Sequence, residues 1–168
     1  MLLFNYIKTN LKAAMEYRKA FFLQVFGMVL NNASFIFFWM LLLPIIGGSL
    51  NGYGFTEIMF LWSLASTGFG LCAVIFGNAF SLSSIIMKGE LDVYLLQPTN
   101  LLGNVLCSRM NVSGLGDIVY GFVLFAATQN ASPYSWGLFL IFTLLSMLLF
   151  TAVLVSYHSL TFYIGNGE

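Results

Sequence analysis

The chain has 168 residues, of which 60% are hydrophobic and 7% are charged, and its six Lys or Arg residues balance six Asp or Glu residues. Its mean hydropathy is +0.91, whereas a soluble domain carries about 25% charged residues. Too few polar side chains remain to cover a water-soluble globule, so the composition predicts an all-α integral membrane protein. The zero net charge gives no reason to expect a nucleic-acid partner.

Residues 1–19 are predicted to form an amphipathic helix, because apolar and charged side chains separate onto two faces at helical spacing. The apolar face holds Leu3, Ile7, Leu11, Ala14 and Met15, and the charged face holds Lys8, Lys12, Glu16 and Lys19. Such a helix lies in the membrane interface with its basic face toward the lipid headgroups. The bilayer is therefore the first predicted partner.

Four apolar stretches follow, at about 20–46, 57–87, 101–128 and 136–164. Crossing a bilayer takes about 20 such residues, so each stretch is predicted to be a membrane-spanning helix. Lys and Arg residues precede the first stretch, and Lys88 lies between the second and the third. The positive-inside rule then places the N-terminus and residues 87–100 in the cytoplasm, in a multi-pass protein of the cytoplasmic (inner) membrane.

Small residues recur every three or four positions along the second stretch, which predicts a continuous stripe on one helix face. The stripe consists of Ser63, Ser66, Gly70, Ala73, Gly77, Ser81 and Ser84. Stripes of this kind let two helices approach closely. Two interpretations stay open: an interface between subunits or a translocation path, and ordinary packing inside the helix bundle.

The third stretch is the least apolar, with Arg109 early in it and Asp117 about two turns further along. An acidic side chain at membrane depth is a candidate functional residue, and it needs a partner or water. The alternative is a structural acid satisfied by Arg109 or by a neighbouring helix. This alternative is favoured, because no second acid completes a proton relay.

Residues 87–100 hold Lys88, Glu90 and Asp92 between two nearly uncharged stretches. Gly89 suits the end of the preceding helix, and acidic residues favour the first turn of a new one. Pro98 ends that short helix and Asn100 caps the next. The segment is predicted to be a small amphipathic helix at the membrane surface, offering an apolar and acidic face to a partner outside the bilayer.

The same segment, from Lys88 through Gly-Glu-Leu-Asp-Val-Tyr-Leu-Leu-Gln to Pro98, resembles the signature of type-2 ABC transporter permeases. That signature has a basic residue followed by Gly-Glu-Leu-Asp, a Leu-Leu pair and a Pro, between the second and third spans. Residues 16–18 (Glu-Tyr-Arg) and 54–57 (Gly-Phe-Thr-Glu) also fit the pattern, and the likeness covers about residues 1–128.

The resemblance implies a permease subunit, with export as the expected direction, which pairs with an ABC ATPase subunit and a second permease subunit. The implied contacts with the ATPase are Lys88, Glu90, Leu91, Asp92, Tyr94, Leu95 and Leu96. Gln97 stands where the family often has a basic residue. Family members commonly have six spans and this chain supplies four, so the resemblance implies a permease truncated after the fourth.

The residues themselves predict no chemistry in this chain. No Gly-rich phosphate loop, nucleophile–base pair or metal-ligand cluster is apparent, so no cofactor is expected here, and ATP and Mg²⁺ are assigned to the partner ATPase. Two alternatives to a permease stay open. One is an intramembrane enzyme that uses Asp117 and His158, and the other is a small membrane scaffold protein.

Overall fold

A computed structural model describes residues 2–98, 100–128 and 132–165, and the regular elements in these ranges are helices. Their bounds are as follows: α1 Leu2–Glu16, α2 Arg18–Ile45, α3 Phe55–Ile75, the 3₁₀ helix η1 Gly77–Ser81, α4 Leu82–Met87, α5 Leu91–Leu95, α6 Leu101–Cys107, α7 Gly114–Thr128, α8 Pro133–Ser159 and α9 Thr161–Ile164. The prediction of an all-helical chain is confirmed for these residues.

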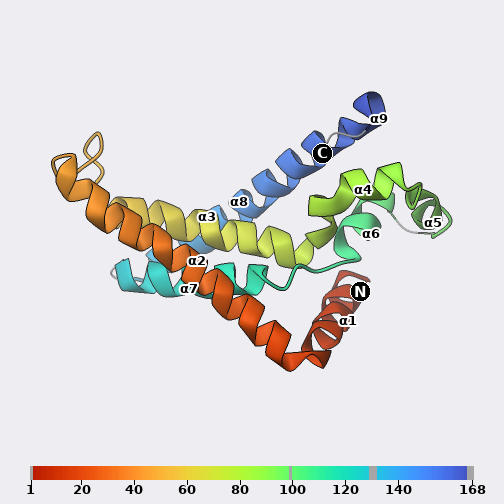
Figure 1. The fold of residues 1–168 in the computed structure, drawn as a ribbon, viewed down its shortest axis with the longest axis horizontal. Helices are drawn as coiled ribbons and strands as arrows, with labels where there is room; N and C mark the ends of the chain where they lie inside the picture. The colour runs from red at the N-terminus through yellow and green to blue at the C-terminus, as the bar shows by residue number, and fades with distance from the viewer. Residues whose placement is uncertain (1, 99, 129–131, 166–168) are drawn as a thin grey trace.

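Helices α2, α3 and α8 with α9 are each long and apolar enough to cross a membrane. Helix α7 is apolar but has 15 residues, about 22 Å at about 1.5 Å per residue, against about 30 Å of bilayer hydrocarbon. In Figure 1 the loop between α2 and α3 lies at one end of the molecule. Helices α1, α5, α6 and α9 lie at the other end (Figure 1).

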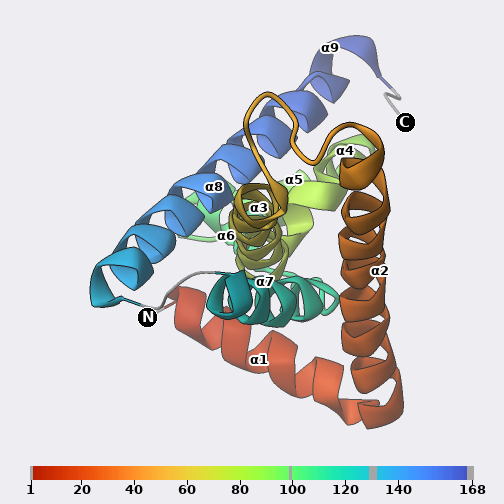
Figure 2. The ribbon, with the colours of Figure 1, turned by 90° about the vertical axis from the view of Figure 1, so that its left-hand side faces the viewer.

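Helix α3 is the centre of the bundle and packs against α7 and α8, as the end-on view in Figure 2 shows. Close approach depends on glycine at the crossings. A Cβ atom at Gly70 would lie 2.6 Å from the Gly114 carbonyl oxygen, and one at Gly68 would lie 2.6 Å from the Ser146 Cβ. Backbones that approach so closely leave no space for a larger side chain.

The expected uninterrupted helix over 57–87 is wrong, because α3 ends at Ile75 and the chain continues as η1 and α4. In a continuous helix the Ala73 carbonyl would accept a hydrogen bond from the N–H of residue 77. Here it accepts one from Asn111 at 2.9 Å. Gly77 also lies so close to residues 109–111 that an added Cβ would come within 2.5 Å of the Arg109 carbonyl oxygen. A tertiary contact therefore ends this helix.

The expected single helix over 101–128 is also wrong, since it is divided into α6 and α7 by residues 108–113. The Asn111 side chain accepts hydrogen bonds from the Ser113 N–H at 3.2 Å and the Ser113 hydroxyl at 2.8 Å. Asn forms such local turns in competition with the helix. Arg109 consequently lies outside any helix and is exposed.

Several predicted helix ends are confirmed. Helix α2 ends at Ile45, within one residue of the predicted end at about 46, and Gly47 and Gly48 follow it with φ angles of +93° and +85°. Gly89 has φ +68°, and the Asn100 side chain accepts a hydrogen bond from the Gly103 N–H at 3.1 Å. Residues 1, 99, 129–131 and 166–168 lie outside the described residues.

Candidate functional site

Helix α5 has an inward face that packs on the rest of the chain. Leu91 and Tyr94 contact a buried cluster formed by Leu82, Ile85 and Val105. The Tyr94 hydroxyl forms a hydrogen bond with the Ser108 hydroxyl at 3.1 Å. These two side chains of the predicted ATPase contact set are thus partly used inside the chain, where they fix the position of α5.

The outward face of α5 combines acidic and apolar side chains. Glu90 and Asp92 are exposed, as is Lys88 before them. Leu95 is 62% exposed and Leu96 is 88% exposed, and the neighbouring Val93 is 62% exposed. This helix of five residues therefore presents exposed leucines at its C-terminal end. Val93 was not among the predicted ATPase contacts. Its place in the Val-Tyr-Leu-Leu run was a signal that could have added it to them.

Polar side chains behind α5 connect it to α1 and to η1, the 3₁₀ helix that follows α3. Asn104 donates a hydrogen bond to Gln97 and accepts one from the Tyr6 hydroxyl. Asn78 donates to the Ser108 hydroxyl, which also contacts Tyr94. Sequence analysis did not predict this network, because Tyr6 and Asn104 are 98 positions apart and no local pattern joins them.

The small-residue stripe is divided by the break after Ile75, so it is not one continuous helix face. Ser63, Ser66, Gly70 and Ala73 are buried on α3, where Gly70 and Ala73 meet Gly114 of α7 and the Ser66 hydroxyl donates to the Asp117 carbonyl at 3.1 Å. Gly77 lies against residues 109–111, and Ser81 and Ser84 are half-buried. Within the described residues, the α3 part of the stripe serves packing inside the chain.

Asp117 is 2% exposed and receives a hydrogen bond from the Asn32 amide at 2.6 Å. Its partner is thus a neighbouring helix and not Arg109. The second carboxylate oxygen, Oδ2, has no hydrogen-bond partner in the structure. Asp117 lines a cavity of about 340 Å³, together with Met28, Asn31, Asn32, Trp62, Ala65, Ser66, Phe69 and Phe150. The Asn32–Asp117 contact joins α2 to α7 across 85 positions, and no sequence signal predicted it.

His158 lines a different cavity, of about 160 Å³, with Ser83 and Thr161 among its other lining residues. Ser83 and Thr161 share a hydrogen bond of 2.8 Å, which joins α4 to α9. Asp117 and His158 therefore line separate cavities, and the arrangement does not assemble them into one catalytic pair. Among the described residues, no group of three or more His, Cys, Asp or Glu side chains could hold a metal ion.

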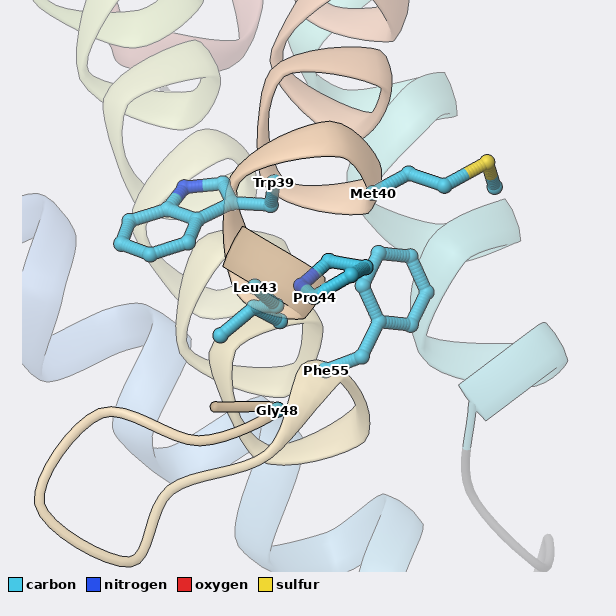
Figure 3. A pocket seen from close by; sticks show the side chains of 6 residues that line it. All are labelled: Trp39, Met40, Leu43, Pro44, Gly48 and Phe55. Carbon is cyan, nitrogen blue, oxygen red and sulfur yellow. The ribbon is translucent and has the colours of Figure 1, made fainter. Parts of the chain in front are cut away.

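A third cavity, of about 260 Å³, lies where α2 ends and α3 begins. Figure 3 shows the side chains around it, which come from Trp39, Met40, Leu43, Pro44, Gly48 and Phe55. None of these side chains carries a charge. The cavity offers an apolar wall and no group for catalysis.

Comparison with protein families gives a match to the model described as ABC-2 family transporter protein, over residues 29–166. The chain belongs to the ABC-2 transporter family. Comparisons with curated proteins and with solved structures give no match. The resemblance seen in residues 88–98 is thereby confirmed, and the family match extends through α8, beyond the region where the resemblance was noted.

Membership of the ABC-2 family makes this chain a multi-pass membrane protein of the permease type. The transport subunits of this family are generally not catalytic, and they normally work with an ABC ATPase. Two features of the ABC-2 permease are therefore candidate functional sites. The outward face of α5 is a candidate contact for a partner, and the cavity at Asp117 is a candidate site inside the membrane region.

Proposed function

We propose that this chain is a membrane-spanning subunit of an ATP-driven exporter and that α5 is the helix through which a separate ATPase subunit moves it. The observation that supports this proposal is the two-faced character of α5. Leu91 and Tyr94 hold the helix onto the bundle, while Leu95 and Leu96 are exposed beside Glu90 and Asp92. Exposed apolar anchors with a polar rim are typical of protein interfaces.

The proposed topology has four membrane crossings, with the N-terminus and α5 in the cytoplasm. The crossings are α2, α3, α6 with α7, and α8. The supporting observation is that α1, α5 and α9 lie at one end of the molecule and the 46–54 loop lies at the other (Figure 1). Lys8, Lys12 and Lys88 belong to the first end, as the positive-inside rule requires for a cytoplasmic face.

The proposed partners are an ABC ATPase subunit, which binds ATP and Mg²⁺, and a second permease subunit in the cytoplasmic membrane. Helices α2 and α8 leave large apolar side chains exposed along their length, including Phe22, Phe26, Leu41, Leu145 and Leu149. These surfaces suit lipid or another membrane helix. ATP-driven closure of the ATPase would displace α5, and the hydrogen bonds through Ser108 and Asn104 would pass that displacement to η1 and to α1.

The contact can be tested by placing a photo-activated cross-linking amino acid at Leu96 in native membranes. We expect an adduct with a chain that a photoreactive ATP analogue also labels, which identifies the partner as an ATPase. The control position is Leu50, which is 48% exposed in the loop at the opposite end. An ATP-labelled adduct from Leu50 and none from Leu96 would overturn the assignment of α5.

The topology is tested separately with single cysteines at Ser49 and Lys88, both exposed. An impermeant maleimide added to intact cells should label Ser49→Cys and leave Lys88→Cys unlabelled until the membrane is opened. The native Cys72 and Cys107 are buried and should give little background. Labelling of Lys88→Cys from outside would reverse the orientation.

A further inference from the structure

The cavity at Asp117 is partly open, and it holds one acidic group among otherwise uncharged lining residues from α2, α3, α7 and α8. None of its lining residues is basic. The Asn32 amide satisfies one carboxylate oxygen at 2.6 Å, and the other oxygen has no partner although the residue is 2% exposed. A buried carboxylate that is only half satisfied is costly unless a cation or a proton neutralises it.

Three aromatic side chains line the same cavity: Trp62 and Phe69 from α3 and Phe150 from α8. Trp62 is held in place by stacking on Phe35, with ring centroids 3.7 Å apart and planes at 17°. Phe69 and Phe150 meet edge to face at 5.5 Å. Aromatic faces attract cations, and the attraction is stronger where water is excluded.

We infer that this cavity is a binding site for a small organic cation with a flat apolar body. The Asp117 carboxylate would pair with the positive charge, and Trp62, Phe69 and Phe150 would contact the apolar part. Asn32 positions the carboxylate and does not itself carry charge. That such a cation is the transported substrate rests on the proposed function, whereas the binding site itself does not.

The test measures site occupancy directly, on the purified complex in lipid nanodiscs. Asn31 is exposed and lines the cavity, so an Asn31→Cys variant reports occupancy by its rate of reaction with a maleimide. The probe is N-methyl-4-phenylpyridinium. The matched control ligand is 4-phenylpyridine, which has nearly the same shape and is uncharged at pH 8. We expect the cation to slow the labelling of Asn31→Cys and the neutral ligand to leave it unchanged.

Asp117→Asn, which keeps the shape and removes the charge, should weaken protection by the cation about tenfold or more. Asp92→Asn, on the exposed α5, should leave protection unchanged. If Asp117→Asn fails to fold, the comparison of the two ligands on the Asn31→Cys variant with Asp117 intact still tests the cation site. Phe150→Leu in that variant should also weaken protection by the cation.

Equal protection by both ligands, no protection by either, or full protection in Asp117→Asn would overturn the cation site. These outcomes are separable from failure of the proposed function. Cross-linking from Leu96 to the ATPase does not depend on the occupancy of the cavity, and cation binding does not depend on that cross-link.

Discussion

The crossing of α3 with α7 and the short helix α5 differ in how much of their surface is buried within the chain. Where α3 crosses α7, the side chains are small and enclosed, and a Cβ at Gly70 would lie 2.8 Å from the Asp117 Cβ. Helix α5 has no buried residue, and Leu96 is 88% exposed. The side chains at the crossing are buried within the chain, whereas those of α5 are not.

This difference separates a tightly packed element from the surface that we propose as the partner contact. Close packing at Gly70 makes the crossing of α3 with α7 stiff, because dense interiors resist deformation. Five residues of α5 could not hold a fixed position alone, since isolated short helices are marginal in water. The hydrogen bonds of Tyr94 and Gln97 to the rest of the chain supply part of that support.

The largest effect is expected from Gly70→Leu, which places a bulky side chain where two backbones meet. Overpacking of this kind costs about 1–3 kcal/mol or more, and here the obstructing atoms are the Gly114 carbonyl and the Asp117 Cβ. Thermal unfolding of the purified protein should show a lower midpoint. Reaction of the buried Cys72 with maleimide should become faster.

Gly27→Leu is the matched control, because nothing lies within 4 Å of a Cβ at Gly27 on α2. It should leave the unfolding midpoint nearly unchanged. If both variants lost the same stability, the crossing at Gly70 would not be the tightly packed region described here.

A smaller effect is expected from Tyr94→Phe, which keeps the ring in its cluster and removes the hydroxyl that contacts Ser108. The lost hydrogen bond is worth about 1 kcal/mol, so local opening of α5 should become about fivefold more frequent. Hydrogen exchange should accelerate in residues 91–95 and not in residues 116–121. Acceleration in both regions would mean that α5 and α7 open as one unit.

The smallest effect is expected from Glu90→Gln, since this carboxylate is exposed at the rim of the outward face. Rim charges act mainly on the rate of association and are screened by salt. The association rate with the ATPase should fall modestly at low salt and match the unaltered protein at high salt. A loss that salt does not diminish would place Glu90 at the centre of the contact.

The sequence predicted local features well and long-range ones poorly. Gly89 and Asn100 act through their own backbone or their nearest turn, so their roles could be inferred from residue type. The break after Ile75 depends on the Asn111 N–H meeting the Ala73 carbonyl, a contact between segments 38 positions apart. Gly77-Asn78 and the polar run from Ser108 to Ser113 were the available signals of interruption.

In the candidate sites, too, local features could be predicted from the sequence and long-range contacts could not. The exposed acidic and apolar character of residues 90–96 could be inferred from their composition and from the resemblance. The inward position of Tyr94 could not, because it depends on Ser108 being freed from a continuous helix. The pairing of Asp117 with Asn32 likewise depends on how α2 crosses α7.

The central claim is that the exposed leucines of α5 transmit the work of the ATPase. Its most direct test is substrate-stimulated ATP hydrolysis by the reconstituted complex carrying Leu95→Ala and Leu96→Ala together. Truncating buried anchors of an interface commonly costs about 2 kcal/mol or more each. We therefore expect loss of ATPase co-purification and of stimulation, with unchanged thermal unfolding of the permease. Normal assembly and normal stimulation in this double variant would contradict the account.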